Sequence, residues 1–456
     1  MKVVVRILSL AMVAVLTFTA FAGCGAGKEE NAKAPEAANG QTGTGGKPVE
    51  LVLWGGIPAD KGPDAMVENY NKRMDGKVTL KYNRYVTGDG DTAVDIALMS
   101  GEHIDAFLSH DFDKMSGRIN KGITEDLSGL MKKYDFDMTE NFGAATKPFQ
   151  QQDGKVFAIP TTLMNFFVLL NKDALDAEKL PVPTDWTLDE MADYAKKLTK
   201  GEGANKVFGF FTPRPDLPVI LAGTALDYQF YYNKDITGTN WDKPEFRKAL
   251  EISHKMTNID KSIPSYVDAL TQKLAEADYF PSGKCAMALG LSYVLRNVKD
   301  LEKFPHTFVT AFAPLPKVSG DQSKYYTDQL LNDFFSINAK SQYKAEAFEF
   351  YKWFATEGYI PLIQHGRIPL YQKFDKDSII KELVGDNEKL FDTESMKSVL
   401  LAEAKDPQTI KSYTANAQIF KIYTENYEKF ITGNMNADAM ISDLDKRTTQ
   451  AIKDAK

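Results

Sequence analysis

The sequence predicts an α/β protein divided into two lobes or domains, and three observations indicate this. The chain has 456 residues, more than one ordinary hydrophobic core accommodates. Segments with the periodicity of strands and of helices alternate along it, as in parallel sheets covered by helices on both faces. Two apolar runs, residues 156–159 and 166–170, are separated by Pro160-Thr-Thr. Proline interrupts a strand ladder because it has no amide donor.

The N-terminal residues have the pattern of an export signal. Lys2 and Arg6 accompany an apolar run, residues 7–22, that falls short of the ~20 residues needed to span a bilayer. The run ends in Phe21-Ala-Gly-Cys24, which resembles the lipobox of bacterial lipoproteins, with Phe21 where Leu is usual. The resemblance implies that residues 1–23 are a cleaved lipoprotein signal peptide. Cys24 would then become an acylated N-terminus carrying palmitate or a similar chain.

Residues 24–48 are predicted to be a flexible tether. From Gly25 to Pro48 no bulky apolar residue occurs, so this segment cannot bury enough surface to fold. Cys285 is the only other cysteine and lies in an apolar, strand-like run. We expect it to be a buried and inert thiol rather than a nucleophile, and acylation of Cys24 would leave no disulfide within the chain.

The first elements after the tether alternate between strand and helix. Strands are expected at residues 49–54, 78–85 and 103–108, and helices at residues 61–72 and 92–100. This order predicts a parallel sheet with helices on both faces.

Residues 153–173 admit two interpretations. The two apolar runs with Pro160 between them are either a crossing between two halves of the protein or one strand with a kink inside a single sheet. The residues alone favour neither.

Helices and strands continue beyond this segment. A helix over residues 187–199 begins with a capping box formed by Thr187 and Glu190. Apolar strands that end in prolines or are followed by Gly and Pro predict further crossings at Phe308–Pro316 and near Gly366–Leu370. The remaining expected elements are a helix over 244–259, strands at 285–289 and 334–338, a helix over 343–356, and two C-terminal helices within 412–455 that are separated at Gly433-Asn434.

Several of these segments, taken in order, resemble one known family. They are similar to segments of the extracellular sugar-binding proteins of ABC importers, the maltodextrin-binding-protein-like family. The similar segments are Thr92–Asp111, Gly154–Pro160 with Leu169–Leu175, Thr184–Met191, Phe280–Tyr293, and Ala313–Pro316 with Ser336–Ser341.

The resemblance implies a periplasmic-binding-protein-like type II fold, with two α/β lobes, a ligand cleft between them and a hinge of several crossings. It makes residues 153–173 the first crossing. The first lobe is then expected to comprise residues 49–159 and 312–366, and the second lobe residues 160–311 and 367–456.

Motifs of enzyme and metal chemistry are missing from the sequence. There is no Gly-x-Ser-x-Gly, His-Glu-x-x-His, phosphate-binding Gly-Lys-Ser/Thr or Cys-x-x-Cys, and the five histidines stand apart. A calcium loop starting at Asp89 would need a carboxylate where Ser100 stands. With 55 Lys plus Arg against 62 Asp plus Glu, a large basic nucleic-acid surface is not expected. We expect no metal, no cofactor and no nucleic-acid partner.

Candidate ligand contacts are side chains just after predicted strands, because ligands of open α/β sheets bind beyond the carboxyl ends of strands. Sugars present hydroxyls for polar side chains and C–H faces for aromatic rings. Trp54 ends the first strand, and a core tryptophan is the alternative. Trp241, in the same aromatic-rich segment as Tyr231 and Tyr232, is either part of an aromatic platform or lobe core. Arg367, at the third crossing, binds a ligand or forms a surface salt bridge.

The resemblance adds further candidates on family-matched loops. Asp111 follows the third strand at the family's ligand-contacting position, with a solvated loop carboxylate as the alternative. Asn165 lies just past the first crossing, and Tyr293 stands where the family commonly has a ligand-stacking Trp. Asp328 and Asn332 lie in a loop where the family often has glycines.

From the resemblance, the expected function is capture of an extracellular mono- or oligosaccharide in the cleft and delivery to the permease subunits of an ABC importer. The protein would be a lipid-anchored monomer on the extracellular face of the cell membrane, and not an enzyme. Two alternatives remain: an extracellular glycoside hydrolase, and a lipoprotein that binds a non-sugar cargo or reports to a sensor.

Overall fold

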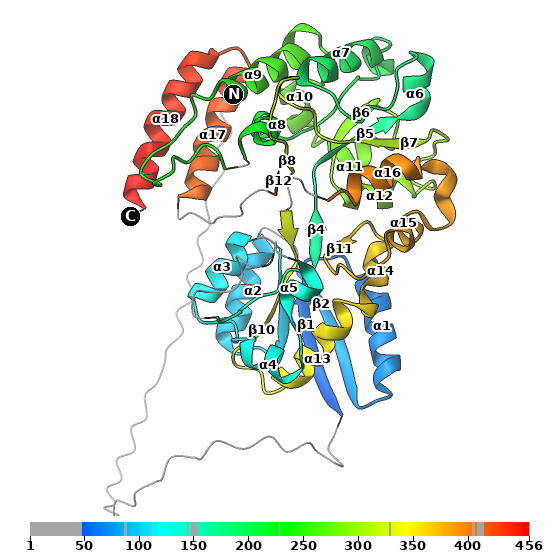
Figure 1. Cartoon of the computed structure of the whole chain (residues 1–456), viewed down its shortest axis with the longest axis vertical. Helices are drawn as coiled ribbons and strands as arrows, with labels where there is room; N and C mark the ends of the chain where they lie inside the picture. Colours follow the sequence, from blue (N-terminus) through cyan, green and yellow to red (C-terminus); the bar gives the residue numbers. More distant parts are fainter. Residues whose placement is uncertain are drawn as a thin grey trace, which may run out of the picture. The chain divides into compact units, whose positions relative to one another are not determined.

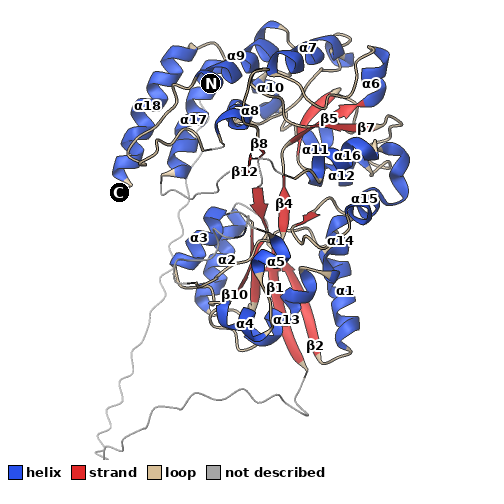
Figure 2. Cartoon of the chain, viewed as in Figure 1, coloured by secondary structure: helices blue, strands red, loops and turns tan. Residues whose placement is uncertain are grey.

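The computed structural model describes residues 48–85, 89–110, 112–143, 146, 154–227, 229–327, 330–403, 406–407 and 415–455. Residues 1–47 and 48–456 are separate units, and the second unit contains every element described below. Two main sheets with helices around them make up this unit (Figures 1 and 2). We call the elements around the sheet β10-β3-β1-β2 the first lobe, and those around the sheet β6-β5-β7 the second lobe.

The first lobe follows the predicted alternation. Its strands β1, β2 and β3 are parallel, and β10 is antiparallel to β3. The apolar positions of β1 point into the core, and α1 covers the sheet with Met66 and Tyr70. Its elements are β1 (Val49–Gly55), α1 (Pro63–Met74), β2 (Val78–Arg84), α2 (Asp89–Ser100), β3 (Ala106–Ser109), α3 (Phe112–Asn120), α4 (Ser128–Lys133), α5 (Met138–Phe142), β10 (Phe334–Ile337), α13 (Lys344–Phe354) and α14 (Ile360–Ile363).

The second lobe has an antiparallel sheet instead of the parallel one expected. Strand β5 pairs antiparallel with both β6 and β7, because the chain enters this lobe at the edge where β6 and β7 end. Its elements are β5 (Phe167–Asn171), α6 (Lys172–Ala177), α7 (Leu188–Leu198), α8 (Leu217–Leu226), α9 (Pro244–His254), α10 (Tyr266–Thr271), α11 (Glu276–Tyr279), β6 (Met287–Gly290), α12 (Leu295–Val298), β7 (Thr310–Ala313), α15 (Lys376–Val384), α16 (Thr393–Leu400), α17 (Asn416–Ile431) and α18 (Ala437–Asp454).

Two predicted helix features are confirmed in this lobe. The Thr187 hydroxyl accepts from the Glu190 amide at 3.3 Å, and the Glu190 carboxylate accepts from the Thr187 amide at 2.7 Å, which is the expected capping box. The helix expected over residues 244–259 is α9 followed by one π-helical turn, Lys255–Ile259.

A third sheet connects the lobes. Its strands are β4 (Thr162–Met164), β9 (Leu330–Asn332) and β11 (Ile368–Pro369), and β4 pairs antiparallel with both neighbours. We call these the hinge strands; Figure 1 shows β4 and β11 between the elements of the two lobes. Strands β4 and β11 lie within the segments expected to form the first and third crossings.

The second crossing does not lie where the sequence predicts it. Residues 308–316 contain β7, which pairs with β5 inside the second lobe, and the prolines after it only end that strand. The chain crosses at β9 instead. The remaining lobe boundaries stay a prediction. A small pair, β8 (Tyr326–Thr327) with β12 (Asp406–Pro407), completes the strands of the described residues.

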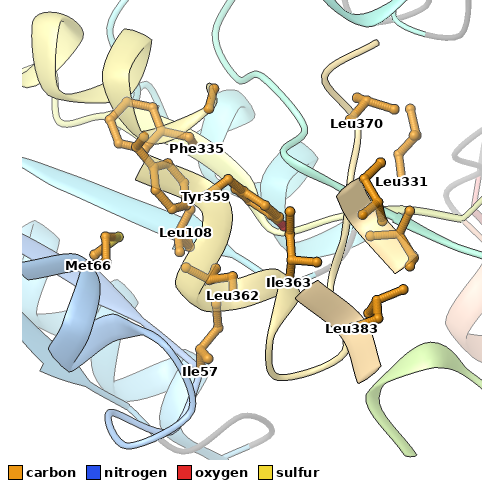
Figure 3. Packing of buried hydrophobic residues seen from close by; sticks show 14 of the residues in the cluster. Ile57, Met66, Leu108, Leu331, Phe335, Tyr359, Leu362, Ile363, Leu370 and Leu383 are labelled. Atoms are coloured by element: carbon orange, nitrogen blue, oxygen red, sulfur yellow. The ribbon is translucent and has the colours of Figure 1, made fainter. Parts of the chain in front are cut away.

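One hydrophobic cluster runs from the first lobe into the hinge strands. Figure 3 shows Ile57, Met66 and Leu108 of the first lobe in the same cluster as Leu331 of β9 and Leu370 after β11. The cluster continues into the second lobe through Phe167, Phe312 and Cys285, whereas a separate cluster fills the rest of that lobe. Cys285 is 0% exposed, as predicted, and burial raises the pKa of its thiol.

Candidate functional site

The register of the second lobe places several polar and aromatic residues on one edge of its sheet. Phe167, the first residue of β5, lies opposite Gly290, the last residue of β6. The segment ending at Phe211 runs parallel to β6 and bridges to Ala288. Asn165 before β5, Arg214 after Phe211, and Tyr293 after β6 are therefore brought to the same edge, beside the hinge strands.

Tyr293 lies where the two hydrophobic clusters meet, since it packs against both. Its hydroxyl donates to the Glu276 carboxylate at 2.6 Å, and the Arg296 guanidinium lies over its ring, 5.6 Å from the centroid. Burial, with a smaller contribution from Glu276, raises the pKa of the Tyr293 hydroxyl. Tyr293 is thus held in one orientation by its own lobe, at the edge that faces the hinge.

Gly366 fixes how closely the third crossing approaches this loop. Its φ is +85°, and a Cβ on it would lie 2.4 Å from the Ser292 carbonyl oxygen and 3.1 Å from the Tyr293 Cα. Only glycine meets both conditions, because it has no Cβ and tolerates positive φ. Arg367 is consequently placed next to the Tyr293 loop.

The first lobe presents the carboxyl ends of β1 and β3 where β10 begins, directly after β9. Trp54 lies at this end of β1, opposite Asn83 and Phe107. It is half-buried and packs against Phe107 and Tyr85. Its Nε1 is buried and has no hydrogen-bond partner among the residues that the structure describes. A donor without an acceptor is uncommon in a folded protein and indicates a group that a ligand can satisfy.

A buried polar network joins the three hinge strands. The Arg367 guanidinium forms an ion pair with the Asp333 carboxylate, which also accepts from the Thr162 hydroxyl at 3.0 Å. The Thr161 hydroxyl donates to the Asp333 carbonyl oxygen at 2.9 Å, and Tyr359 contacts Thr162. We call Asp333, Arg367, Thr161, Thr162 and Tyr359 the hinge network. Arg367 is therefore in a buried ion pair, not the surface salt bridge considered as its alternative.

Asn332, the last residue of β9, also lies at the hinge. Its Oδ1 accepts from the Asp333 amide at 2.8 Å, and it pairs with Thr162 across the sheet. Asn332 therefore lies in the hinge sheet, Asn165 directly follows the hinge strand β4, and Arg367 follows Gly366, which lies against the Tyr293 loop. The sequence does not single out Asp333 as a site residue, although its positive φ of 51° places it in a conformation that favours Asn and Asp.

The prediction for Trp241 is wrong, and its alternative as lobe core is correct. Trp241 is 1% exposed, stacks on Tyr231 with ring centroids 4.8 Å apart, and donates from Nε1 to the Thr448 hydroxyl at 3.1 Å. Tyr423 stacks at 5.7 Å. A ring covered in this way offers no face to a ligand. Three other predicted positions, Cys24, Asp111 and Asp328, lie outside the described residues.

Three of the surface cavities formed by the described residues lie away from these site residues. They measure about 680, 690 and 420 Å³, and none is lined by a predicted site residue. They lie beside α9 and α17, beside α10 and α11, and between α1 and α13. Within the described ranges no group of His, Cys, Asp and Glu is arranged to hold a metal ion. No helix in the same ranges is long and apolar enough to cross a bilayer.

Charged groups that the sequence does not single out surround the Tyr293 loop. Arg214 pairs with Asp216 at 3.0 and 2.8 Å and lies over the Phe166 ring at 4.9 Å. Burial, followed by the nearby Arg367, lowers the pKa of Arg296. Burial also lowers the pKa of Lys299 to about 8. Their positions in the sequence could have identified two of these residues as candidates, because Arg214 and Arg296 come a few residues after buried strand segments.

Comparison with solved structures shows a shared fold. A sugar transporter protein from Rhizobium etli in an open conformation has a TM-score of 0.68 at 21% identity, covering 89% of this chain and 99% of that chain. An ABC substrate-binding protein from Listeria monocytogenes in complex with cycloalternan has a TM-score of 0.70 at 20% identity, covering 89% and 98%. A maltose/maltodextrin-binding domain from Bdellovibrio bacteriovorus bound to maltotriose has a TM-score of 0.65 at 17% identity, covering 89% and 100%. The predicted type II binding-protein fold is confirmed.

The model of the bacterial extracellular solute-binding protein family matches residues 55–360. This match includes the strands of both main sheets except β1, together with the hinge strands β4 and β9, and the family and the structures above are binding proteins. The chain described here belongs to the bacterial extracellular solute-binding protein family.

Proposed function

We propose that this protein captures an extracellular carbohydrate, a mono- or oligosaccharide, between its two lobes and delivers it to the permease of an ABC importer. The observation that carries the proposal is the meeting of two sheet edges at the hinge strands. One edge carries Trp54, and the other carries Asn165 and Tyr293, with Arg367 directly before the hinge strand β11. Neighbours of the same fold bind cycloalternan and maltotriose.

The side chains at these edges suit a sugar. The Tyr293 ring, held by Glu276, offers a flat face for sugar C–H groups, and the Trp54 Nε1 offers a donor that no acceptor among the described residues uses. Asn165 adds an amide next to the first hinge strand. None of these groups needs a metal or a cofactor to act.

Binding would couple to lobe closure through the hinge strands. A ligand that contacts Trp54 and Tyr293 together binds more tightly when the lobes are closed, and this difference in affinity shifts the population towards the closed form. The permease would recognise that form. The three short strands and the hinge network define where the chain bends.

We further propose that the protein is a monomeric lipoprotein on the extracellular face of the cell membrane. The support is the basic, apolar and small-residue pattern that ends at Cys24 and the tether-like composition of residues 24–48. Mass spectrometry of the membrane-bound protein tests this proposal. The expected N-terminus is an acylated Cys24, and a free N-terminus at another residue contradicts it.

A thermal-shift screen of mono- and oligosaccharides tests carbohydrate binding. A ligand at 100 times its Kd stabilises the folded state by about 2.7 kcal/mol, so a true ligand raises the Tm clearly. Tyr293→Ala should weaken binding of that ligand, whereas Phe420→Ala, at a ring on α17 that is 49% exposed, should not. Recovery of the bound sugar unchanged is expected. If the sugar is recovered cleaved, the protein is a hydrolase and the transport proposal is wrong. If no sugar raises the Tm, the carbohydrate proposal is wrong.

A further inference from the structure

Arg296 lies beside Tyr293 at the proposed carbohydrate site. It lies in α12, six residues after Gly290 ends β6, and its guanidinium covers the Tyr293 ring. Tyr293 in turn contacts both hydrophobic clusters and lies against Gly366 of the third crossing. Arg296 is therefore on the edge of the second lobe that faces the hinge.

The other arginines at this edge are neutralised by carboxylates, but Arg296 is not. Asp216 binds Arg214 through two hydrogen bonds of 3.0 and 2.8 Å, and Asp333 pairs with Arg367. Over the described residues Arg296 forms no hydrogen bond and no ion pair, and its only recorded partner is the Tyr293 ring. A half-buried guanidinium normally has a carboxylate or carbonyl partner, because five donors need acceptors.

The carboxylates around Arg296 are already engaged with other groups. Asp60, in the loop after β1, pairs with Lys61 at 3.1 Å. Asp278 accepts from Asn297 at 2.8 Å and lies 3.5 Å from Lys303.

Two further charged groups belong to this environment. The Glu276 carboxylate accepts from Tyr293. Lys299, one turn after Arg296, donates to the carbonyl oxygens of Gln364 and Leu383 and to no carboxylate.

Among the described residues, the positive charge of the Arg296 guanidinium is therefore not paired with a carboxylate. The pKa of Arg296 is lowered by burial and by Arg367, while Asp60 and Asp278 only partly offset this. The protonated guanidinium is thus less favourable here than in water. An anion that pairs with it would remove this cost.

We propose that Arg296 binds a carboxylate of the cargo, so that the natural ligand is an acidic saccharide such as an oligosaccharide containing uronic acid. The proposal rests on the carbohydrate-binding function above and specifies its substrate class. A planar carboxylate matches the fork of the guanidinium and can accept two parallel hydrogen bonds. The sugar ring that carries it would lie beside the Tyr293 ring.

The test compares acidic and uncharged forms of the same sugars on the purified full-length protein. Calorimetry measures the Kd of short galacturonate and glucuronate oligosaccharides, of their methyl esters, and of the neutral galactose and glucose counterparts. A sulfated and a phosphorylated disaccharide distinguish a carboxylate from other anions. The expected result is a uronate that binds about tenfold or more tighter than its ester, as for a hydrogen bond to a charged group.

Variants of Arg296 then assign the preference to one side chain. Arg296→Gln should reduce the ratio of ester Kd to acid Kd to near one, and Arg296→Lys should keep part of it. Arg247→Gln, which removes an exposed arginine that pairs with Asp438 on α18, should leave the ratio unchanged. Urea denaturation checks that each variant is folded. If Arg296→Gln does not fold, the ratio of ester Kd to acid Kd of the wild-type protein still tests the proposal.

The outcomes separate the two proposals. If neutral oligosaccharides bind as tightly as uronates, or Arg296→Gln leaves the ratio unchanged, the acidic-ligand proposal is overturned and carbohydrate binding stands. Preference for a sulfated or phosphorylated sugar over the uronates also overturns it. If no sugar of any charge binds, both proposals fail.

Discussion

The ion pair between Asp333 and Arg367 should be a major source of stability at the hinge. The side chain of Asp333 is 5% exposed and that of Arg367 15% exposed, so water cannot replace a lost partner. Asp333→Asn keeps the shape of the side chain and suits the positive φ of 51° at this position. It removes only the charge. Leaving a buried charge unpaired costs about 3–5 kcal/mol, and we expect a loss of that size in the free energy of unfolding.

Urea denaturation followed by tryptophan fluorescence measures this loss, and a double-mutant cycle isolates the pair. Arg367→Met should cost a similar amount, because it leaves Asp333 as the uncompensated charge. The double variant should recover much of the stability, giving a coupling energy of about 2 kcal/mol or more. Glu357→Gln is the matched control. It breaks the exposed pair with Arg73, whose side chains are 54% and 69% exposed, and should change stability by less than about 1 kcal/mol.

A loss below about 1 kcal/mol for Asp333→Asn, or additive single variants, would refute the reasoning. It would mean that Arg367 reaches water or another acceptor once the charge is gone. Because Arg367 is also a predicted ligand contact, sugar binding should be measured on the same variants. A change in affinity without a change in stability would assign Arg367 to the ligand instead of the hinge.

Three further predictions concern single positions. Gly366→Ala should cost about 2–4 kcal/mol, because it adds a strained φ to a clash with the Ser292 carbonyl, and urea denaturation measures this loss. Gly76→Ala, at a φ of +76° with nothing within 4 Å, shows the cost of φ alone, and an equal loss at both glycines would contradict the clash. Thr187→Ala should cost about 1 kcal/mol in the same assay through loss of the cap on α7, and an unchanged midpoint would contradict this. Lys299 has a pKa of about 8 in the folded protein, below its value in the unfolded chain, so folding releases its proton at alkaline pH. Compared with Lys299→Met, the wild-type protein should gain unfolding free energy as pH rises from about 8 to about 10.5, and a parallel pair of profiles would contradict the lowered pKa.

The first strands of the first lobe are predicted well because each has the apolar pattern of a strand, and β1 pairs with the next strand along the chain, β2. Strands expected at residues 49–54 and 78–85 are β1 and β2, which lie side by side, and the helices expected after them are α1 and α2. Both C-terminal helices and the break between them are also where the pattern predicts them.

The prediction of the second crossing is wrong because the same local pattern occurs both at a crossing and at an ordinary strand end. An apolar strand that ends in prolines marks a crossing at Ile159-Pro160 and only a strand end at Ala313-Pro314. The strand that does cross, β9, has three residues and a polar end, so it carries little periodicity. Which strand crosses between the lobes depends on pairing between segments that are far apart in the sequence. The local residue pattern carries no information about that pairing.

The candidate site is predictable only in part for the same reason. Tyr293 and Asn165 are candidates because they follow strands on loops that resemble the family's, and both lie at the edge of the second lobe beside the hinge strands. Trp241 is a candidate only because other aromatic residues lie near it in the sequence, and in the structure Tyr231 and Tyr423 cover it. Asp333 and Arg296 were missed because their importance depends on which charges remain unpaired after folding.

The buried thiol of Cys285 has a practical consequence for observing the protein at work. If Cys24 is acylated, the remaining cysteine is enclosed and resists alkylation while the chain is folded. A single cysteine introduced at Ile96 on α2, which is 58% exposed, would then be the one site that a maleimide dye modifies. An environment-sensitive fluorophore at that position would turn the protein into an optical reporter for its own solute.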